Sequence, residues 1–284
     1  MTADSSDSSA ISLSVAGLHA SALDGPWARG VRAAIGWCAS VGYRGIQLDA
    51  SASEIRPRAI DRSARRDLAA SVRRAGLGFT GLDLWIPPEH FSAGEHADRA
   101  HAALLGAIGL AADLRGLVPS GSASAPAVVS AAFPDDYAGR GEVLAQADAV
   151  GVLVEDFGVG ATAPPSESAA NDGGVDEGRA HGSIRPGIDT ARLIMRSQPP
   201  GKTFAKLSKS AATLRVNDAD DTGRREMGKG QLDVSTLLAL HATLTPGLPI
   251  VTDLRGIEHP DRGARAAIDV IRSGMDLPGF GPMS

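Results

Sequence analysis

The chain has 284 residues, a mass of 29.0 kDa and a formal net charge of −5 at pH 7. Apolar residues make up 43% and charged residues 21%, which is typical of a globular protein that buries a sizeable core. The acidic balance argues against a broad nucleic-acid-binding surface. The single cysteine, Cys38, excludes an internal disulfide and a zinc site built from several cysteines.

The two chain ends differ in composition from the part between them. Residues 1–9 are polar and acidic, which predicts a disordered tail and not the basic start and apolar run of a signal peptide. Residues 276–284 are expected to form a C-terminal tail. No run of about 18 apolar residues stands out, so we expect no membrane-spanning segment and a cytoplasmic protein.

Between the tails, short apolar runs alternate with helical periodicity. The expected strands cover 11–15, 45–49, 77–86, 127–133, 152–157, 184–188, 213–218 and 248–253. The expected helices cover 31–39, 60–72, 95–114, 142–150, 190–197, 234–242 and 262–273. About eight strand–helix units in a chain of this size predict a single-domain α/β fold, a (β/α)8 TIM barrel over residues 10–275. A doubly wound open sheet is the alternative, but the turn after the first strand lacks the glycine spacing that such folds use.

One segment, residues 160–183, interrupts this alternation. It is rich in Gly, Pro, Ser, Ala and acidic residues and has no apolar period. A long loop after a barrel strand can act as a lid over the active site, and it can equally be a disordered insertion. The composition favours a disordered insertion, and a lid is the alternative interpretation.

Polar residues end most of the expected strands, where a parallel barrel places its active site. They are His19, Asp49, Asp83, Glu155, Asp156, Asp189, Arg215, Asn217, Asp218, Asp253 and Arg255. Carboxylates that converge on one barrel mouth need a cation, a proton or arginines beside them. Some of them, such as Asp49, Asp83 and Asp218, have the simpler alternative of capping the helices that follow.

Several short motifs recur in a fixed order along the chain. They are GYRGIQLD at 42–49, LVED at 153–156, GIDT at 187–190, LRVND at 214–218, GKGQLD at 228–233 and IVTD at 250–253. In this order and spacing the chain resembles the xylose-isomerase-like TIM barrel superfamily, which includes sugar phosphate isomerases and epimerases and endonuclease IV. The resemblance covers roughly residues 10–273, and its most specific part is the segment at 228–233.

The resemblance also implies where a metal site would lie. The family's metal ligands end strands five, six, seven and eight, and Glu155 and Asp189 match the first two of these positions. The expected histidines are replaced by Arg192 and Arg215, and the last Glu is shortened to Asp253. Arginine has no lone pair to donate to a metal and does not deprotonate. The complete family metal site is therefore expected to be degenerate.

Two arrangements remain open at these positions. In one, a divalent metal (Mn, Mg or Zn) persists on Glu155, Asp189 and Asp253, with water and substrate oxygens completing its shell. In the other, which we favour, Arg192, Arg215 and Arg255 replace the charge of the metal and pair with carboxylates or with an anionic substrate.

The resemblance implies proton transfer next to a sugar carbonyl, and Glu155 and Asp253 are the expected acid and base. The expected substrate contacts are His19, Trp85, Arg192, Arg215 and Arg255. The predicted function is a sugar phosphate isomerase or epimerase acting on a small-molecule substrate, with no nucleic-acid or membrane partner. The alternative is a catalytically inactive TIM barrel that binds a small anionic ligand or acts as a scaffold subunit.

Overall fold

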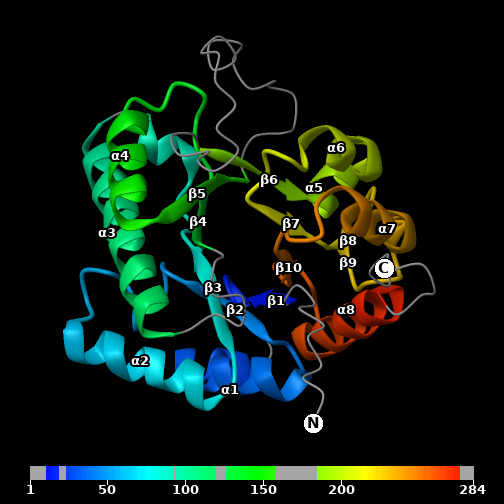
Figure 1. Cartoon of the computed structure of the whole chain (residues 1–284), viewed down its shortest axis with the longest axis horizontal. Coiled ribbons are helices and arrows are strands. Elements are labelled where there is room, and N and C mark those ends of the chain that lie inside the picture. Colours follow the sequence, from blue (N-terminus) through cyan, green and yellow to red (C-terminus); the bar gives the residue numbers. More distant parts are fainter. Residues whose placement is uncertain (1–10, 19–23, 93, 119–125, 158–183, 276–284) are drawn as a thin grey trace.

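The computed structural model describes residues 11–18, 24–92, 94–118, 126–157 and 184–275. Within them, eight parallel strands close into a barrel in the order β1-β10-β7-β6-β5-β4-β3-β2 (Figure 1). This confirms the predicted single-domain (β/α)8 TIM barrel. The strands are β1 (Ser12–Ser14), β2 (Gly45–Asp49), β3 (Gly78–Asp83), β4 (Ala127–Ala131), β5 (Val152–Asp156), β6 (Arg185–Asp189), β7 (Thr213–Arg215) and β10 (Ile250–Asp253).

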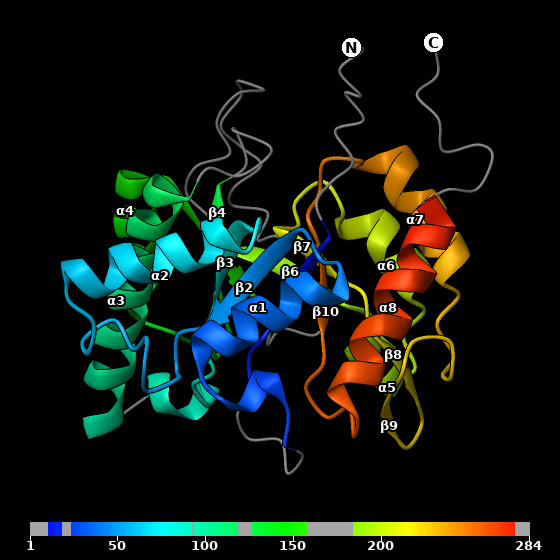
Figure 2. The same cartoon turned by 90° about the horizontal axis from the view of Figure 1, so that it is seen from below.

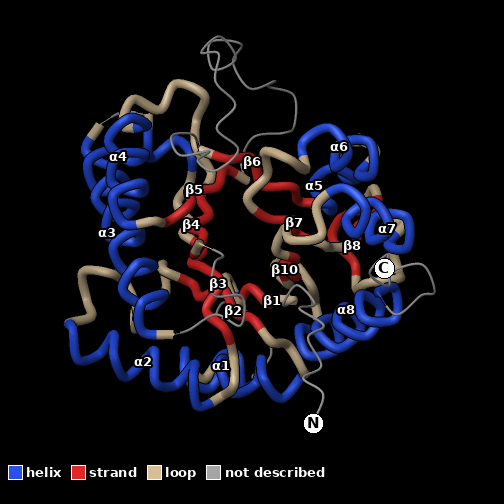
Figure 3. The backbone as a smooth tube through the Cα atoms, in the orientation of Figure 1, coloured by secondary structure: helices blue, strands red, loops and turns tan. Residues whose placement is uncertain are grey.

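Helices surround this barrel on the outside (Figure 3). They are α1 (Val31–Val41), α2 (Arg62–Arg74), α3 (Glu95–Leu117), α4 (Arg140–Val150), α5 (Thr190–Met195), α6 (Pro200–Leu207), α7 (Val234–Leu244) and α8 (Pro260–Met275). Two 3-10 turns, η2 (Pro26–Ala28) and η3 (Pro88–Phe91), precede α1 and α3.

The helix ends follow from local sequence signals. At the start of α2, the Asp61 side chain accepts a hydrogen bond from the Ala64 amide at 2.8 Å. At the end of α1, Gly42 adopts a φ of 109°, a left-handed conformation that glycine takes without steric cost. These caps place the periodic apolar side chains of both helices against the barrel.

Two expectations about the second half are corrected. The predicted strand 213–218 ends at Arg215, and Asp218 begins a separate antiparallel hairpin of β8 (Asp218–Asp220) and β9 (Gly223–Arg225). Figure 2 shows this hairpin beside α5. The helix expected over 190–197 ends at Met195, and a further helix that the periodicity did not predict, α6, starts at Pro200, because proline fits the first helical turn, where its nitrogen needs no intrahelical partner.

The long helix α3 qualifies the expectation about membrane segments. By length and composition α3 is apolar enough to cross a membrane. In this fold it packs along β3, β4, α2 and α4, with buried residues that include Leu104, Ile108 and Leu114. Its apolar composition is that of a helix in the protein core.

Some expectations concern residues outside the described ranges. They are the tails 1–9 and 276–284, the segment 160–183, and His19.

The register of the strands decides which polar side chains meet in the barrel. Ser14 lies opposite Asp253, Ser130 lies opposite both Asp83 and Glu155, and Asp189 lies opposite Arg215. Because all eight strands are parallel, these residues come to the same end of the barrel. The barrel interior at this level is therefore charged instead of apolar.

Candidate functional site

Arg215 lies at the centre of the barrel and its side chain is fully buried. Its Nη2 donates to Asp83 at 2.5 Å and to Gln47 Oε1 at 3.0 Å, and its Nη1 donates to Asp253 at 3.4 Å. Glu155 Oε2 is 3.8 Å from Nη2. One guanidinium thus contacts carboxylates from three different strands. These neighbours outweigh the effect of burial and hold the pKa of Arg215 above its ordinary value, so it stays charged.

Glu155 is buried beside Arg215 but makes its hydrogen bonds to hydroxyl groups. Ser130 Oγ donates to it at 2.6 Å, and Thr213 Oγ1 donates to its other oxygen. Gly187 lies against this side chain, and a Cβ at that position would collide with the carboxylate. Burial raises the pKa of Glu155, and the opposing effects of Arg215 and the two hydroxyls do not cancel this rise. Glu155 can therefore hold a proton at higher pH than an ordinary glutamate.

Asp253 is buried too, but its surroundings favour the ionised form. The Arg255 guanidinium binds it through Nε at 2.8 and 2.9 Å, and Nη1 of Arg224 is 3.7 Å away. Burial alone would raise the pKa of Asp253, yet Arg255 and Arg224 outweigh it and hold that pKa well below its usual range. The pKa values of the two carboxylates expected to act as acid and base are thus shifted in opposite directions, up for Glu155 and down for Asp253.

Arg224 joins Asp189 to the same network. Its Nη2 donates to Asp189 at 2.5 Å, and the Asn217 side chain connects Asp189 with the Asp253 backbone amide through bonds of 3.3 and 2.8 Å. Arg224 lies on β9, so the unexpected hairpin carries a cation into the site.

These ion pairs define what we call the carboxylate–arginine cluster. Its members are Asp83, Glu155, Asp189, Asp253, Arg215, Arg224 and Arg255. Four carboxylates face three guanidinium groups, so the fully ionised cluster has one excess negative charge. A proton on Glu155 makes the cluster neutral, which agrees with the raised pKa of that residue.

Four buried nitrogen atoms at this site have no hydrogen-bond partner among the described residues. They are Gln47 Nε2, Arg215 Nε, Arg224 Nη1 and Arg255 Nη1. All four are donors, and three belong to permanent cations. The site is thus suited to a ligand that offers several oxygen acceptors.

The residues do not fit the metal site that the resemblance implies. No group of three or more His, Cys, Asp or Glu side chains is placed to hold a metal ion in the part of the chain that the structure describes. Asp189 and Asp253 are bound by Arg224 and Arg255, and Glu155 is bound by Ser130 and Thr213. A cation bound there would lie beside arginines that repel it.

The other predicted contact residues lie around this cluster. Trp85 follows β3 with 56% of its surface exposed, and its ring stacks on Phe157 at 5.7 Å. The guanidinium carbon of Arg255 is 4.4 Å from the centre of the Trp85 ring. Arg192 is half-buried and donates to the Phe157 carbonyl, outside the cluster itself.

Asp218 has a structural role, and it explains the segment 228–233. Its carboxylate accepts hydrogen bonds from the amides of Gly228, Gly230 and Leu232 at 2.8–2.9 Å. A Cβ on Gly230 would collide with this carboxylate. Asp233, the last residue of the segment, caps α7 by accepting from the Thr236 amide at 3.0 Å.

Several members of the site escaped the sequence analysis. The sequence pattern marks Asp83 only as a strand end or a helix cap, and it gives Gln47 no role, although a polar residue inside an apolar barrel strand is unusual. Ser130 and Thr213 carried the same signal. Arg224 had no signal, because it lies on a hairpin that the sequence pattern did not predict.

Comparison with known proteins bears on the fold. No family model matches the sequence, and no curated protein is similar to it at the sequence level. Among solved structures, this chain is similar to D-psicose 3-epimerase from Clostridium cellulolyticum H10, which was determined with D-tagatose. The TM-score is 0.65 at 14% sequence identity, and the match covers 94% of this chain and 99% of that one. The chain has the fold of a xylose isomerase-like TIM barrel.

Two further xylose isomerase-like structures agree with this assignment. A xylose isomerase domain protein from Planctomyces limnophilus has a TM-score of 0.64 at 14% identity, covering 93% of this chain and 96% of that one. A xylose isomerase-like TIM barrel protein from Mycobacterium smegmatis, in complex with magnesium, has a TM-score of 0.62 at 15% identity, covering 94% and 97%. At these identities the likeness concerns the fold.

Proposed function

We propose that this protein is a sugar isomerase or epimerase that moves a proton next to a sugar carbonyl. The observation that carries the proposal is the position of Glu155, whose pKa is raised, beside the guanidinium of Arg215, whose Nε has no acceptor among the residues that the structure describes. The sugar epimerase with the same fold supports this reaction class.

In the proposed mechanism, Glu155 transfers the proton. A carboxylate with a raised pKa is a stronger base than an ordinary one, so ionised Glu155 can take the proton from carbon and return it to the neighbouring carbon, which is an isomerisation. Epimerisation needs a proton on the opposite face of the same carbon, and water supplies that proton. Asp253 is held in its ionised form by Arg255 and Arg224 and is a poor proton carrier at neutral pH. Its role is to fix the positions of these two arginines by charge-assisted hydrogen bonds.

The arginines stabilise the negative charge that develops on the carbonyl oxygen. Removal of a proton next to a carbonyl gives an enediolate, and its oxygen is stabilised by fixed cationic donors in a site with little water. Arg215 Nε and Arg255 Nη1 are donors without an acceptor in the described part of the chain. We infer that they take the place of a divalent ion, so that the reaction proceeds without a metal bound by the protein.

The substrate that we propose is a small ketose or aldose, and its phosphate ester is the preferred form. The excess of donors over acceptors at the site favours a ligand rich in oxygen atoms, and arginine binds phosphate groups through paired hydrogen bonds.

The direct test is exchange of carbon-bound hydrogen with solvent. The protein is incubated in D2O with a panel of ketoses and their phosphate esters, and loss of the proton next to the carbonyl is followed by NMR. We expect exchange with at least one sugar, and Glu155→Gln should slow it by about 10²–10⁴-fold, the usual contribution of general acid–base catalysis. Glu142→Gln, which changes a surface carboxylate of α4 that pairs with His101, is the matched control. Exchange that survives unchanged in Glu155→Gln would contradict the role of Glu155.

Metal content tests the role of the arginines separately. We expect the purified protein to contain far less than one Mn, Mg, Zn, Co or Fe per chain, and a chelator to leave both the Tm and the exchange rate unchanged. A bound ion stabilises the folded state by mass action, so near-stoichiometric metal with a chelator-sensitive Tm would show that the carboxylates bind metal despite the arginines.

A further inference from the structure

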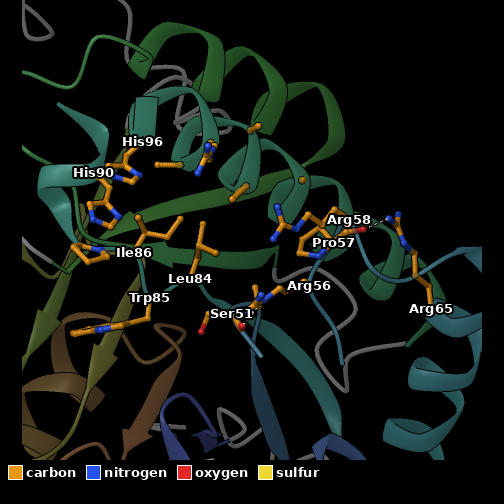
Figure 4. A pocket seen from close by; sticks show the side chains of 17 residues that line it. Ser51, Arg56, Pro57, Arg58, Arg65, Leu84, Trp85, Ile86, His90 and His96 are labelled. Atoms are coloured by element: carbon orange, nitrogen blue, oxygen red, sulfur yellow. Dashed lines mark hydrogen bonds between the residues drawn. The ribbon is translucent and has the colours of Figure 1, made fainter. Parts of the chain in front are cut away.

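A second cavity opens beside the barrel, between the loop after β2, the loop after β3 and helix α3. Its volume is about 650 Å³. Figure 4 shows its two ends: His90, His96 and Trp85 lie at one, and Arg56, Pro57 and Arg58 at the other. No member of the carboxylate–arginine cluster lines it.

The charge of this cavity is entirely positive. Arg56, Arg58, Arg65 and Arg99 line it together with two histidines, and no carboxylate of the described residues does. Arg65 is paired with Asp113 at 2.5 Å, and Arg56 donates to the Ser51 carbonyl at 2.9 Å. Neither Arg58 nor Arg99 forms an ion pair or hydrogen bond with a residue in the described ranges. Two guanidinium groups are therefore available to an anion, in a chain whose net charge is negative.

The remaining wall of the cavity is apolar. Leu84, Ile86 and Pro57 form one side of it, and small residues of α3 form the other. At the histidine end, the rings of His90 and His96 stack with centroids 4.8 Å apart. A cavity of this volume lies in the range of about 300–1,000 Å³ typical of sites for small organic molecules. An inorganic anion alone would leave most of the apolar wall uncovered.

We propose that this cavity binds an organic phosphate with a planar ring, of which a nucleoside diphosphate is the simplest example. The phosphate groups pair with Arg58 and Arg99, and the ring packs on the apolar wall and the histidine rings. This site is distinct from the proposed catalytic one and does not depend on it. Trp85 is the point of contact between them, because it lines the cavity and also lies under Arg255.

Isothermal titration calorimetry with ADP tests the proposal on the whole chain. We expect saturable binding at about one ADP per chain, whereas adenosine and inorganic phosphate each bind at least about tenfold more weakly, since each retains only part of the contacts. In the double variant Arg58→Gln/Arg99→Gln, ADP affinity should fall by about 10- to 100-fold, the effect of losing charge-assisted hydrogen bonds.

The matched control is the double variant Arg62→Gln/Arg66→Gln. Both of its residues are exposed on α2, neither lines the cavity, and the variant loses the same two positive charges. Its affinity for ADP should stay within about twofold of that of the unchanged chain. Both double variants weaken the general electrostatic attraction equally, so a larger loss in Arg58→Gln/Arg99→Gln comes from direct contacts. The measurement is made after both variants are shown to keep the Tm of the unchanged protein.

Three results would overturn the proposal. They are no ADP binding up to about 1 mM, equal weakening in both double variants, and adenosine or inorganic phosphate binding as tightly as ADP. None of these bears on the proposed isomerase or epimerase, which is tested by hydrogen exchange and by metal content.

Discussion

Replacing Arg215 with methionine tests the central feature of the site, a buried cation shared by three strands. The change keeps an unbranched side chain but removes the charge from Asp83, Glu155 and Asp253. Asp253 keeps Arg255 and Arg224 as ion-pair partners, whereas the hydrogen-bond donors that Asp83 and Glu155 keep among the described residues are hydroxyl groups. Removal of one partner from a buried ion pair costs about 3–5 kcal/mol, because the other charge stays buried without a counter-ion.

This cost translates into a measurable loss of thermal stability. For a domain of this size each kcal/mol lowers Tm by about 2–4 °C, so Arg215→Met should lower it by about 6–20 °C. Arg225→Met is the control, because Arg225 forms an exposed ion pair with Asp220 on the hairpin and its loss should leave Tm almost unchanged. Calorimetry at a fixed scan rate gives both values.

The pH dependence of this loss provides the second half of the test. Arg215 opposes the effect of burial on Glu155, so without Arg215 burial raises the pKa of Glu155 further above its ordinary value. Groups of this kind stabilise the folded state below their unfolded pKa, and that contribution is lost as pH rises through the folded pKa. The deficit of Arg215→Met should therefore be larger at pH 8 than at pH 5. A variant with an unchanged Tm, or with a deficit that does not shrink at pH 5, would refute the placement of Arg215 among buried carboxylates.

Three further predictions concern single side chains. Burial raises the pKa of Glu155, so its contribution to the stability of the folded state is lost as pH rises above the ordinary glutamate range. The free energy of unfolding of Glu155→Gln should therefore rise relative to that of the unchanged protein between pH 5 and pH 8. A difference in urea unfolding that stays constant over this range would contradict the prediction. Asp218→Ala removes the acceptor of the amides of Gly228, Gly230 and Leu232 and should lower stability by about 2–4 kcal/mol, whereas Asp218→Asn, which keeps one acceptor oxygen, should lose less. Cys38 is fully buried, and burial raises the pKa of its thiol. It should therefore not react with a thiol reagent at pH 8 until the protein unfolds. Rapid labelling of the folded protein would contradict this and would show that α1 opens locally.

The order of strands and helices could be predicted from local patterns. Apolar runs and capping residues act within a few positions of one another, so the sequence alone placed the barrel strands and most helices near their observed bounds. The errors lie at 199–200 and 213–220, where the sequence carried two opposite signals. Proline is both a signal that a helix stops and a favoured first residue of a helix, and Pro200 starts α6. Asp218 continues an apolar run but turns its carboxylate to the loop at 228–232.

The candidate site was predicted only in part. Glu155, Asp253, Arg215 and Arg255 were expected at strand ends, and they meet in one network. The direction of the Asp253 pKa shift depends first on how closely the Arg255 guanidinium approaches the carboxylate and then on Arg224, which reaches the site from a hairpin. A pKa responds to charges within a few ångströms, and the sequence gives no such distances.

The sequence by itself determined that this chain forms a parallel barrel with carboxylates and arginines at its strand ends. That information is local, since it depends on apolar periodicity, turn residues and the replacement of two expected histidines by arginines. Only the tertiary structure decided which charges pair, that Glu155 and Asp253 have opposite pKa shifts, and that Arg58 and Arg99 line one cavity. Barrel closure brings together residues that are far apart in the chain, and electrostatic interactions depend on those distances and on burial.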